Sequence, residues 1–407
     1  MSLIKPFRAL RPAPGRAAEV LAPPYDVLSS AEARERAAGK PWSFLHVSKA
    51  EIDLPPAADP YAGAVYAKAA ENLRHMIAAG VLIRDDKPCY YVYRLTWRGH
   101  VETGFAAVAS IAAYAENRIR KHEHTAPAKE DDRVRQIEAV NAQTGPVMLA
   151  YPTAPAIDAL LQGAAAGAPL VDVTADDGVR HQLWVIGDEQ TIAALTGAVE
   201  ALPALYIADG HHRSAAAERV EKIRGGDGAH GYFLAVLFPQ AEMTILDYNR
   251  VLRDLNGRSA EELLAELRRR ARVEPSDRPV RPAAANEIGM FLAGRWYRVT
   301  LPPAPAEDTA DPVARLPVTL LTRQIIEPIF GITDQRRDKR IDFVGGGRGL
   351  GELERLVSSG TMAVAFALYP TQMRDLMAVA DAGAVMPPKS TWFEPKLADG
   401  MVSHILD

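Results

Sequence analysis

The chain has 407 residues, more than one ordinary hydrophobic core needs and enough for about two or three domains. Apolar residues make up 48% and charged residues 24%, and the net charge of −4 excludes a general attraction to nucleic acid or anionic lipid. The single cysteine, Cys89, excludes an internal disulfide, and no run approaches the ~20 apolar residues of a membrane span. Residues 1–14 lack the apolar core of a signal peptide. We therefore expect a cytoplasmic protein that binds neither nucleic acid nor membrane.

The first half of the chain predicts alternating helices and strands. Prolines interrupt residues 1–86, where we expect loops around helices, and residues 61–80 have helical spacing that ends at Gly80. Apolar runs at 89–97 and 102–114 flank a turn-like Arg98-Gly99-His100 and predict an antiparallel hairpin. The remaining predicted elements are a helix at 130–143, strands at 146–151, 170–175 and 182–186, a helix at 188–202 and a strand at 204–207.

The second half continues this mixture. Ala216, Val220 and Ile223 recur at helical spacing and predict a helix with one buried stripe. Glycines at 345–351 join a strand to a helix, but Leu350 replaces the last glycine of a dinucleotide fingerprint, which favours a simple turn. The other predicted elements are strands at 232–238 and 363–368, a capped helix at 259–272 and a Pro-rich linker or exposed loop at 278–285. The fold class expected is α+β, with mixed sheets and helices in several domains.

The most informative segment is the turn at residues 209–213, between the strand at 204–207 and the following helix. The first N–H groups of a helix lack partners and carry partial positive charge, so this junction favours an anion such as phosphate. Gly210 allows a sharp turn, Arg213 can bind phosphate oxygens, and Asp209 can accept a proton or hold a metal. An aspartate capping an ordinary helix beside the exposed His211 and His212 is the alternative.

A second group of titratable residues lies at 116–125 and continues to Lys129 and Arg133. Such a segment can supply a carboxylate base and several cations for a polyphosphate. His122 and Glu123 are its candidate catalytic residues. The spacing of His122 and His124, two residues rather than four, excludes the zinc-protease helix. A solvated charged loop and helix face remains the alternative.

A third motif, at residues 386–396, offers Lys389 as a further candidate ligand-binding residue. Pro388 stands where a phosphate-binding loop needs its second glycine, and proline has no N–H to donate, so we exclude a P-loop. A C-terminal tail that docks Trp392 and Phe393 into a groove is the alternative.

The segment Tyr-Ile-Ala-Asp-Gly-His-His-Arg-Ser-Ala-Ala at 206–216 resembles the signature turn of the ParB/sulfiredoxin-like fold, most closely its free-serine kinase branch. Along nearly its whole length the chain also resembles a large, mostly uncharacterised bacterial family, through residues 23–26, 43–47, 122–125, 129–133 and 386–391. The resemblance implies a ParB/sulfiredoxin-like nucleotide-binding region at 101–245. N-terminal and C-terminal α+β regions at 1–100 and 246–407 would flank it.

The resemblance also implies a reaction, the transfer of a phosphoryl group from ATP or ADP, with Mg²⁺, to a small hydroxyl substrate such as L-serine. The resemblance implies that Asp209 is the base or a magnesium ligand. It also implies that a glutamate upstream of the turn is the catalytic partner of Asp209. Glu123 is preferred to Glu51 and Glu116. The residues expected to bind the nucleotide are Gly210, His211, His212, Arg213, Lys129, Arg133 and Lys389.

Two other functional classes stay open. One is a nucleotide-binding sensor of ParB type, which binds or slowly hydrolyses its ligand without kinase turnover. The other is a zinc-dependent hydrolase that uses His122, His124, His211 and His212. The oligomeric state is also open, and a homo-oligomer is compatible with the sequence.

Overall fold

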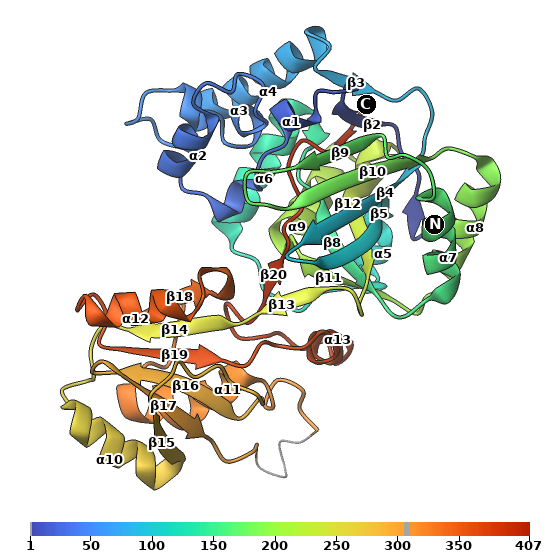
Figure 1. The fold of residues 1–407 in the computed structure, drawn as a ribbon. Coiled ribbons are helices and arrows are strands. Elements are labelled where there is room, and N and C mark those ends of the chain that lie inside the picture. Colours follow the sequence, from blue (N-terminus) through green and yellow to red (C-terminus); the bar gives the residue numbers. More distant parts are fainter. Residues whose placement is uncertain (1, 305–309) are drawn as a thin grey trace. The chain divides into compact units, whose positions relative to one another are not determined.

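The computed structural model describes residues 2–304 and 310–407, which form a mixture of helices and several sheets (Figure 1). Two compact units emerge from the contacts, one comprising Met1–Met243 with Pro395–Asp407 and the other Thr244–Glu394. The α+β class expected from the sequence is therefore confirmed. Within the described ranges, no helix has both the length and the apolar character that crossing a bilayer requires.

The first unit is built on a mixed sheet in which β8 and β12 pair in parallel at the centre. Helices α7 (Pro155–Ala164) and α8 (Glu189–Glu200) bury their apolar residues against this sheet (Figure 1). The sequence analysis did not predict α7. The strand order is β6 (Ile119–Arg120), β11 (Leu205–Asp209), β8 (Val147–Tyr151), β12 (Tyr232–Pro239), β5 (His100–Ser110), β4 (Tyr90–Trp97), β10 (Arg180–Ile186) and β9 (Val171–Thr174), with β1 (Ile4–Lys5) also pairing with β5.

The predicted hairpin is confirmed as β4 and β5, joined by Arg98 and Gly99. Both turn residues have positive φ, 50° and 81°, the conformation that a two-residue hairpin turn needs. The predicted continuation of the second strand to residue 114 is wrong. Ser110 ends β5 because its hydroxyl accepts the N–H of Ala113 and starts helix α5 (Ile111–Ala115).

The N-terminal segment combines a helical core with a small sheet. Its helices are α1 (Ala17–Val20), α2 (Ser30–Ala37), α3 (Leu45–Ser48) and α4 (Gly63–Ala78), the last at the predicted place. The sheet order is β3 (Leu82–Arg84), β2 (Ala9–Pro12), β21 (Ser403–Ile405) and β7 (Ala142–Gln143). Because this sheet joins the start, the middle and the end of the chain, the expected boundary at residue 100 falls inside one unit.

Helices α6 (Pro127–Val140) and α9 (His211–Arg224) pack against each other through Val134, Ile137, Ala216 and Val220. Helix α9 follows β11 as the sequence predicts. However, Ile223 is 63% exposed, so its assignment to the buried stripe is wrong. The stripe ends one turn before the helix does.

The second unit contains an antiparallel sheet whose central strand β19 (Val364–Leu368) is fully buried, as predicted. The segment at 278–285 connects β15 to β16 inside this unit, so it is a loop rather than a linker between units. The strand order is β15 (Arg272–Ser276), β17 (Arg295–Thr300), β16 (Glu287–Leu292), β19, β14 (Tyr248–Leu252) and β18 (Ile341–Gly345), while β13 (Thr244–Leu246) pairs with β20 (Trp392–Glu394). The helices are α10 (Ala260–Arg270), capped by Ser259 as predicted, α11 (Pro317–Leu321), α12 (Leu350–Ser358) and α13 (Met373–Asp381).

Strand β5 offers a test of the sheet in the first unit, because Gly104 lies against the neighbouring strand β12. A Cβ at this position would run into the carbonyl oxygen of Leu237 and the ring of Phe238. Gly104→Ala should therefore lower the free energy of unfolding by about 1–3 kcal/mol, measured by urea denaturation. Gly197→Ala in α8 is the control: a Cβ there meets nothing within 4 Å, and the change should stabilise the helix by up to about 1 kcal/mol. Equal urea midpoints for Gly104→Ala and Gly197→Ala would contradict the close packing of Gly104 against β12.

Candidate functional site

The turn at 209–213 is shaped by an irregularity at the end of β11. The register between β11 and β8 shifts between Ile207 and Asp209, a bulge that redirects the Asp209 side chain. Gly210 then adopts a left-handed conformation with φ of 99°, and an added Cβ would lie 3.2 Å from the Cα of Val147. Both observations require glycine at this position. Helix α9 begins at the next residue, so its first N–H groups face the turn.

Arg213, predicted to bind phosphate, makes its contacts inside the protein. Its side chain is 9% exposed, and its guanidinium donates to the carbonyl oxygen of Pro146 and, at 3.1 Å, to Oδ2 of Asp26. Oδ2 of Asp209 lies 3.7 Å away. Burial would lower the pKa of Arg213, but the charges of Asp26 and Asp209 outweigh this effect and raise it. Arg213 is thus a charged anchor that connects three segments of the first unit.

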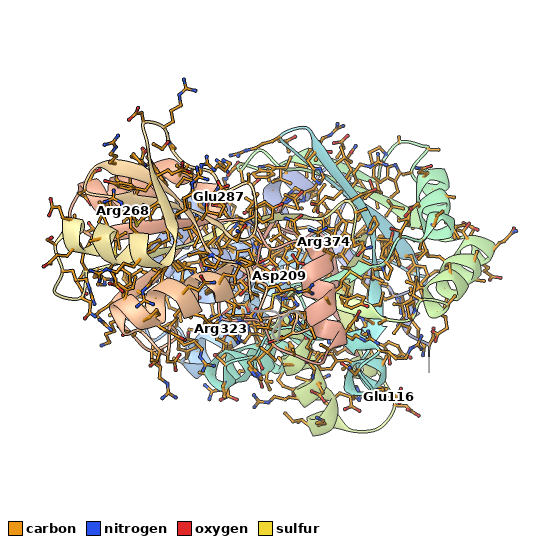
Figure 2. The ribbon with its side chains drawn as sticks, turned by 90° about the horizontal axis from the view of Figure 1, so that it is seen from below. Glu116, Asp209, Arg268, Glu287, Arg323 and Arg374 are labelled. Carbon is orange, nitrogen blue, oxygen red and sulfur yellow. The ribbon has the colours of Figure 1, made fainter. Side chains whose placement is uncertain are left out.

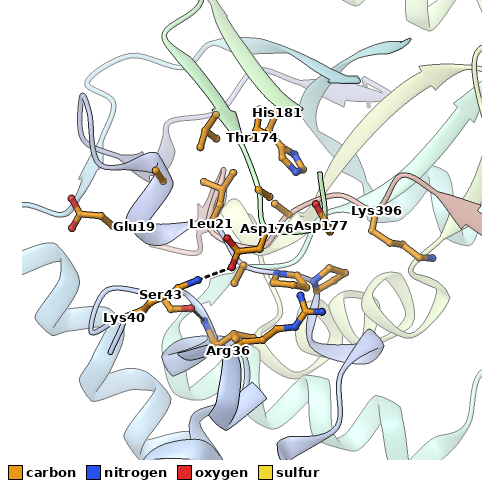
Figure 3. Close-up of a pocket in the computed structure, with 18 of the residues that line it drawn as sticks. Glu19, Leu21, Arg36, Lys40, Ser43, Thr174, Asp176, Asp177, His181 and Lys396 are labelled. Carbon is orange, nitrogen blue, oxygen red and sulfur yellow. Dashed lines mark hydrogen bonds and ion pairs between the residues drawn. The ribbon is translucent and has the colours of Figure 1, made fainter. Parts of the chain in front are cut away.

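Asp209 is held ionised by its neighbours. Burial would raise the pKa of Asp209, but the charges of Lys396 and Arg213 lower it to about 2. The Lys396 ammonium lies 3.5 Å from Oδ2. Lys396 also lines a cavity of about 720 Å³, together with Lys40 and Asp176, which form an ion pair of 2.6 Å (Figure 3). The sequence analysis singled out Lys389 in this motif and missed Lys396.

His122 and His211, which are 89 residues apart in the chain, lie ring to ring. Their centroids are 4.4 Å apart, and the rings are nearly perpendicular. Burial lowers the pKa of His122 to about 4, although the Ile207 backbone and Asp209 oppose the shift. Burial and the neighbouring His122 lower the pKa of His211 well below its ordinary value. Both imidazoles are therefore neutral near pH 7.

Glu123 brings a carboxylate to this pair, with its Oε2 3.9 Å from Nδ1 of His211. The adjacent histidines do not all converge. His124 is exposed, and Nε2 of His212 instead accepts the backbone N–H of Ala126 at 3.0 Å. The four-histidine zinc site considered from the sequence is therefore not assembled. His122 and His211 come together, and Glu123 joins them.

These residues border a cavity of about 280 Å³, which we call the turn cavity. It is lined by Tyr25, Asp26, Glu123, Asp209, Gly210, His211, His212 and Arg213. A larger cavity of about 920 Å³, which we call the adjoining cavity, shares Tyr25, Asp26 and His212 with it. The two cavities are therefore adjacent.

Two predicted cationic residues line the adjoining cavity. Lys129 is exposed on α6, and Arg133 pairs with Asp132 at 2.6 Å while lying 3.9 Å from the centroid of the Tyr25 ring. Tyr61 and Tyr66 add aromatic surface. The sequence analysis did not propose Tyr25 or Asp26 as site residues, although its Pro-Pro-Tyr-Asp motif was the available signal.

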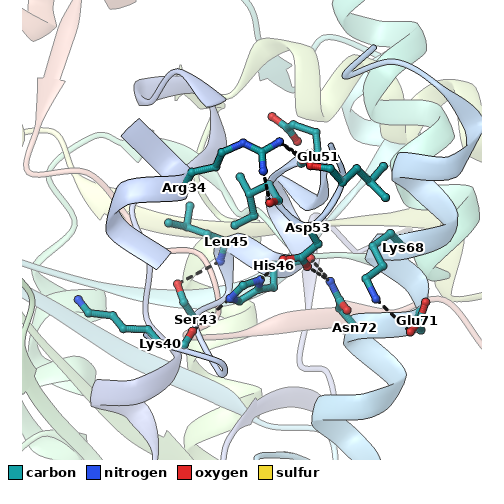
Figure 4. A network of polar contacts seen from close by, with 12 residues as sticks. Arg34, Lys40, Ser43, Leu45, His46, Glu51, Asp53, Lys68, Glu71 and Asn72 are labelled. Atoms are coloured by element: carbon teal, nitrogen blue, oxygen red, sulfur yellow. Dashed lines mark hydrogen bonds and ion pairs between the residues drawn. The ribbon is translucent and has the colours of Figure 1, made fainter. Parts of the chain in front are cut away.

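Glu51, one of the two glutamates to which the sequence analysis preferred Glu123, is a buried residue in the wall of the adjoining cavity. Its Oε1 accepts the Ser30 hydroxyl at 2.7 Å and lies 3.0 Å from the Lys49 ammonium. Arg34 holds the same loop by donating to the carbonyl oxygens of Glu51 and Leu54 at 2.6 and 2.8 Å (Figure 4). This carboxylate is thus fixed by several contacts, whereas the Glu123 side chain is 41% exposed.

Two other residues named from the sequence lie elsewhere. Glu116 follows α5 at the margin of the first unit, away from Asp209 (Figure 2). Lys389 belongs to the second unit, where its φ is 57° and its ammonium lies 5.7 Å from the centroid of the Tyr248 ring. Its backbone carbonyl accepts a hydrogen bond from Arg250 at 2.9 Å. A role of Lys389 in ligand binding stays a prediction.

The comparisons with known proteins identify a family. A family model described as a protein of unknown function, DUF1015, matches residues 4–319, and the chain belongs to this family. No curated protein matches the chain.

Among solved structures, a conserved hypothetical protein from Pyrococcus furiosus is similar with a TM-score of 0.35 and 11% identity, over 72% of this chain and 93% of that one. A free serine kinase variant in complex with ADP has a TM-score of 0.34 and 12% identity, over 71% and 87% of the chains. SbnI from Staphylococcus aureus, truncated at its C-terminus, has a TM-score of 0.37 and 12% identity, over 73% and 86%.

Asp399 lies buried behind the turn and should make the stability of the protein depend on pH. Burial raises the pKa of Asp399 from 3.8 to about 7, although Arg213 and Arg133 oppose the shift. Between about pH 4 and pH 7 the unfolded chain therefore releases a proton that the folded chain keeps, so stability falls as the pH rises.

We compare the free energy of unfolding of the wild type with that of Asp399→Asn at each pH. The difference should fall by about 4 kcal/mol between pH 4 and pH 7, because each unit of pKa shift corresponds to about 1.4 kcal/mol. Chemical denaturation at a series of pH values measures it. Asp227→Asn, at an exposed position, should parallel the wild type. A constant difference between wild type and Asp399→Asn from pH 4 to pH 8 would refute the assignment.

Proposed function

We propose that the protein is a small-molecule kinase that transfers a phosphoryl group from magnesium-bound ATP or ADP to a hydroxyl such as that of free L-serine. The supporting observation is the pairing of the two cavities. The turn cavity combines carboxylates with a helix N-terminus, and the adjoining cavity offers cations and aromatic rings to the rest of a nucleotide. The ParB/sulfiredoxin-like assignment of residues 101–245 is part of this proposal.

The charges of the turn cavity favour a nucleotide that arrives with a divalent cation. The carboxylates of Asp26, Glu123 and Asp209 outnumber the two nearby cations, the Arg213 guanidinium and the Lys396 ammonium, and His211 is neutral. A bare polyphosphate would meet net negative charge. Asp26 and Asp209 are the oxygen ligands that Mg²⁺ prefers, so they fit this ion and would hold it. Bound there, Mg²⁺ would supply positive charge that offsets the phosphate oxygens.

The transfer step then requires a proton acceptor. The substrate hydroxyl oxygen bonds to the terminal phosphorus, the bond from that phosphorus to the bridging oxygen breaks, and the shortened nucleotide leaves. Asp209 is a poor base because its pKa is about 2, far below neutral pH. We therefore assign Asp209 to holding Mg²⁺. Glu123 or Glu51 would accept the proton of the substrate hydroxyl. Arg213 acts as a positioning residue, since its side chain is only 9% exposed and donates to Pro146 and Asp26.

A nucleotide-binding sensor without turnover is the second candidate. The observation that favours it is the same low pKa of Asp209, together with the internal pairing of Arg213. Both suit a site that binds a ligand without moving a proton. Binding and turnover must therefore be measured separately.

The binding test is calorimetric titration of the full chain with ADP or ATP in the presence of magnesium or of EDTA. We expect binding only with magnesium. Asp209→Asn should weaken it about 10–100-fold, because a contact to a charged group contributes about 1.5–3 kcal/mol. Glu116→Gln, at an exposed position distant from the turn, is the control and should bind as the wild type does. Equal affinity with EDTA would contradict the role given to the carboxylates.

The turnover test follows labelled phosphate from ATP or ADP to a panel of hydroxyl amino acids. Loss of the base should lower kcat about 10²–10⁴-fold while nucleotide binding is retained. Glu51→Gln and Glu123→Gln, assayed side by side, identify which carboxylate takes the proton. Magnesium-dependent binding with no labelled product from any acceptor would reject the kinase and support the sensor.

A further inference from the structure

Beside the turn, the first unit contains a compact group of nitrogen and oxygen donors, of which only Glu123 has been given a candidate part in the proposed kinase reaction. His122 and His211 are 1% and 5% exposed, and they project from two segments distant in sequence. One donor atom from each of His122, Glu123 and His211 lies within 4.8 Å of the other two. Two imidazoles with one carboxylate are a donor set found in zinc and other transition-metal sites.

The interior position of His122 is an independent indication of a ligand. Neither of its ring nitrogens makes a hydrogen bond of good geometry, and both are inaccessible to solvent. Leaving buried polar groups without such bonds destabilises a folded protein. Buried polar atoms in folded proteins are nearly always satisfied. A bound metal ion would satisfy one of these nitrogens.

We propose that His122, Glu123 and His211 bind one divalent transition-metal ion of the zinc type, at a site distinct from the oxygen ligands assigned to magnesium. The ion would join the segment before α6 to the first turn of α9. Imidazole nitrogen as a donor favours such an ion over Mg²⁺ or Ca²⁺, which prefer oxygen. His124 and His212 take no part, since one is exposed and the other accepts the Ala126 N–H.

Metal binding would bring the three donor atoms, which lie within 4.8 Å of one another, closer together. In a tetrahedral site with bonds of about 2.1 Å, neighbouring donor atoms are about 3.4 Å apart. Oε2 of Glu123 and Nδ1 of His211 are separated by 3.9 Å, and the half-exposed Glu123 side chain can move. With the metal on Nδ1, the His211 proton shifts to Nε2. Nε2 of His211 then no longer accepts the His122 backbone N–H. The hydrogen bond that is lost is a long one, at 3.4 Å.

The test measures metal binding by the full chain without nucleotide, so its result is independent of the kinase assay. Protein freed of metal with a chelator is titrated with Co²⁺ and Zn²⁺, and with Mg²⁺ for comparison. We expect one Co²⁺ or Zn²⁺ per chain, visible absorption bands for bound Co²⁺, and displacement of Co²⁺ by Zn²⁺. Excess Mg²⁺ should leave the Co²⁺ spectrum unchanged.

Variants assign the ligands. His122→Asn and His211→Asn should abolish the Co²⁺ bands, and Glu123→Gln should weaken Zn²⁺ binding about 100-fold or more. Glu123→Gln alters a half-exposed side chain, so it keeps the test decisive if a buried histidine variant fails to fold. His124→Asn, exposed in the same segment, is the matched control and should bind as the wild type does. Absence of stoichiometric Co²⁺ and Zn²⁺, or equal binding by wild type and Glu123→Gln, would overturn the proposal.

Discussion

The guanidinium of Arg213 is the interaction around which the first unit is organised. A buried cation is costly unless it is paired and hydrogen-bonded. Here its partners come from three places in the chain: Asp26 near the N-terminus, the carbonyl oxygen of Pro146 before β8, and Asp209 at the end of β11. Because satisfying one charge requires all three segments, the shape of the turn and the position of the N-terminal loop are set together.

The same arrangement gives neighbouring carboxyl groups different protonation states. Asp209 faces Lys396 as well as Arg213, and its pKa falls to about 2. Asp399 is more deeply buried, and its pKa rises to about 7 despite Arg213 and Arg133. Groups whose environments separate their pKa values in this way are typical of functional sites. The contrast arises from the balance between burial and paired cations, since both residues are aspartates.

Local features of the site and of the fold could be predicted from the sequence. Features that depend on contacts between distant segments could not. The β11–turn–α9 junction and the hairpin at Arg98 and Gly99 follow from short patterns, and both are present. The contact of Lys396 with Asp209 depends on a tail that returns to the first unit, and no spacing rule encodes it. Helix α7 was missed although Ile157 and Leu161 recur at helical spacing. Ile223 was misplaced because periodicity does not reveal where a neighbouring helix ends.

The internal pairing of Arg213 changes how an anion would be bound at this turn. A guanidinium that is only 9% exposed and already contacts Asp26 and the Pro146 carbonyl presents little accessible surface to phosphate. The groups left to attract an anion are the first N–H groups of α9 and any cation held by the carboxylates of the turn cavity. Binding at this position would then depend on the backbone conformation of Gly210 and on a divalent ion more than on arginine. The sequence, in which Arg213 is the conspicuous cation, gives no sign of this because its partners lie 187 residues and 67 residues away.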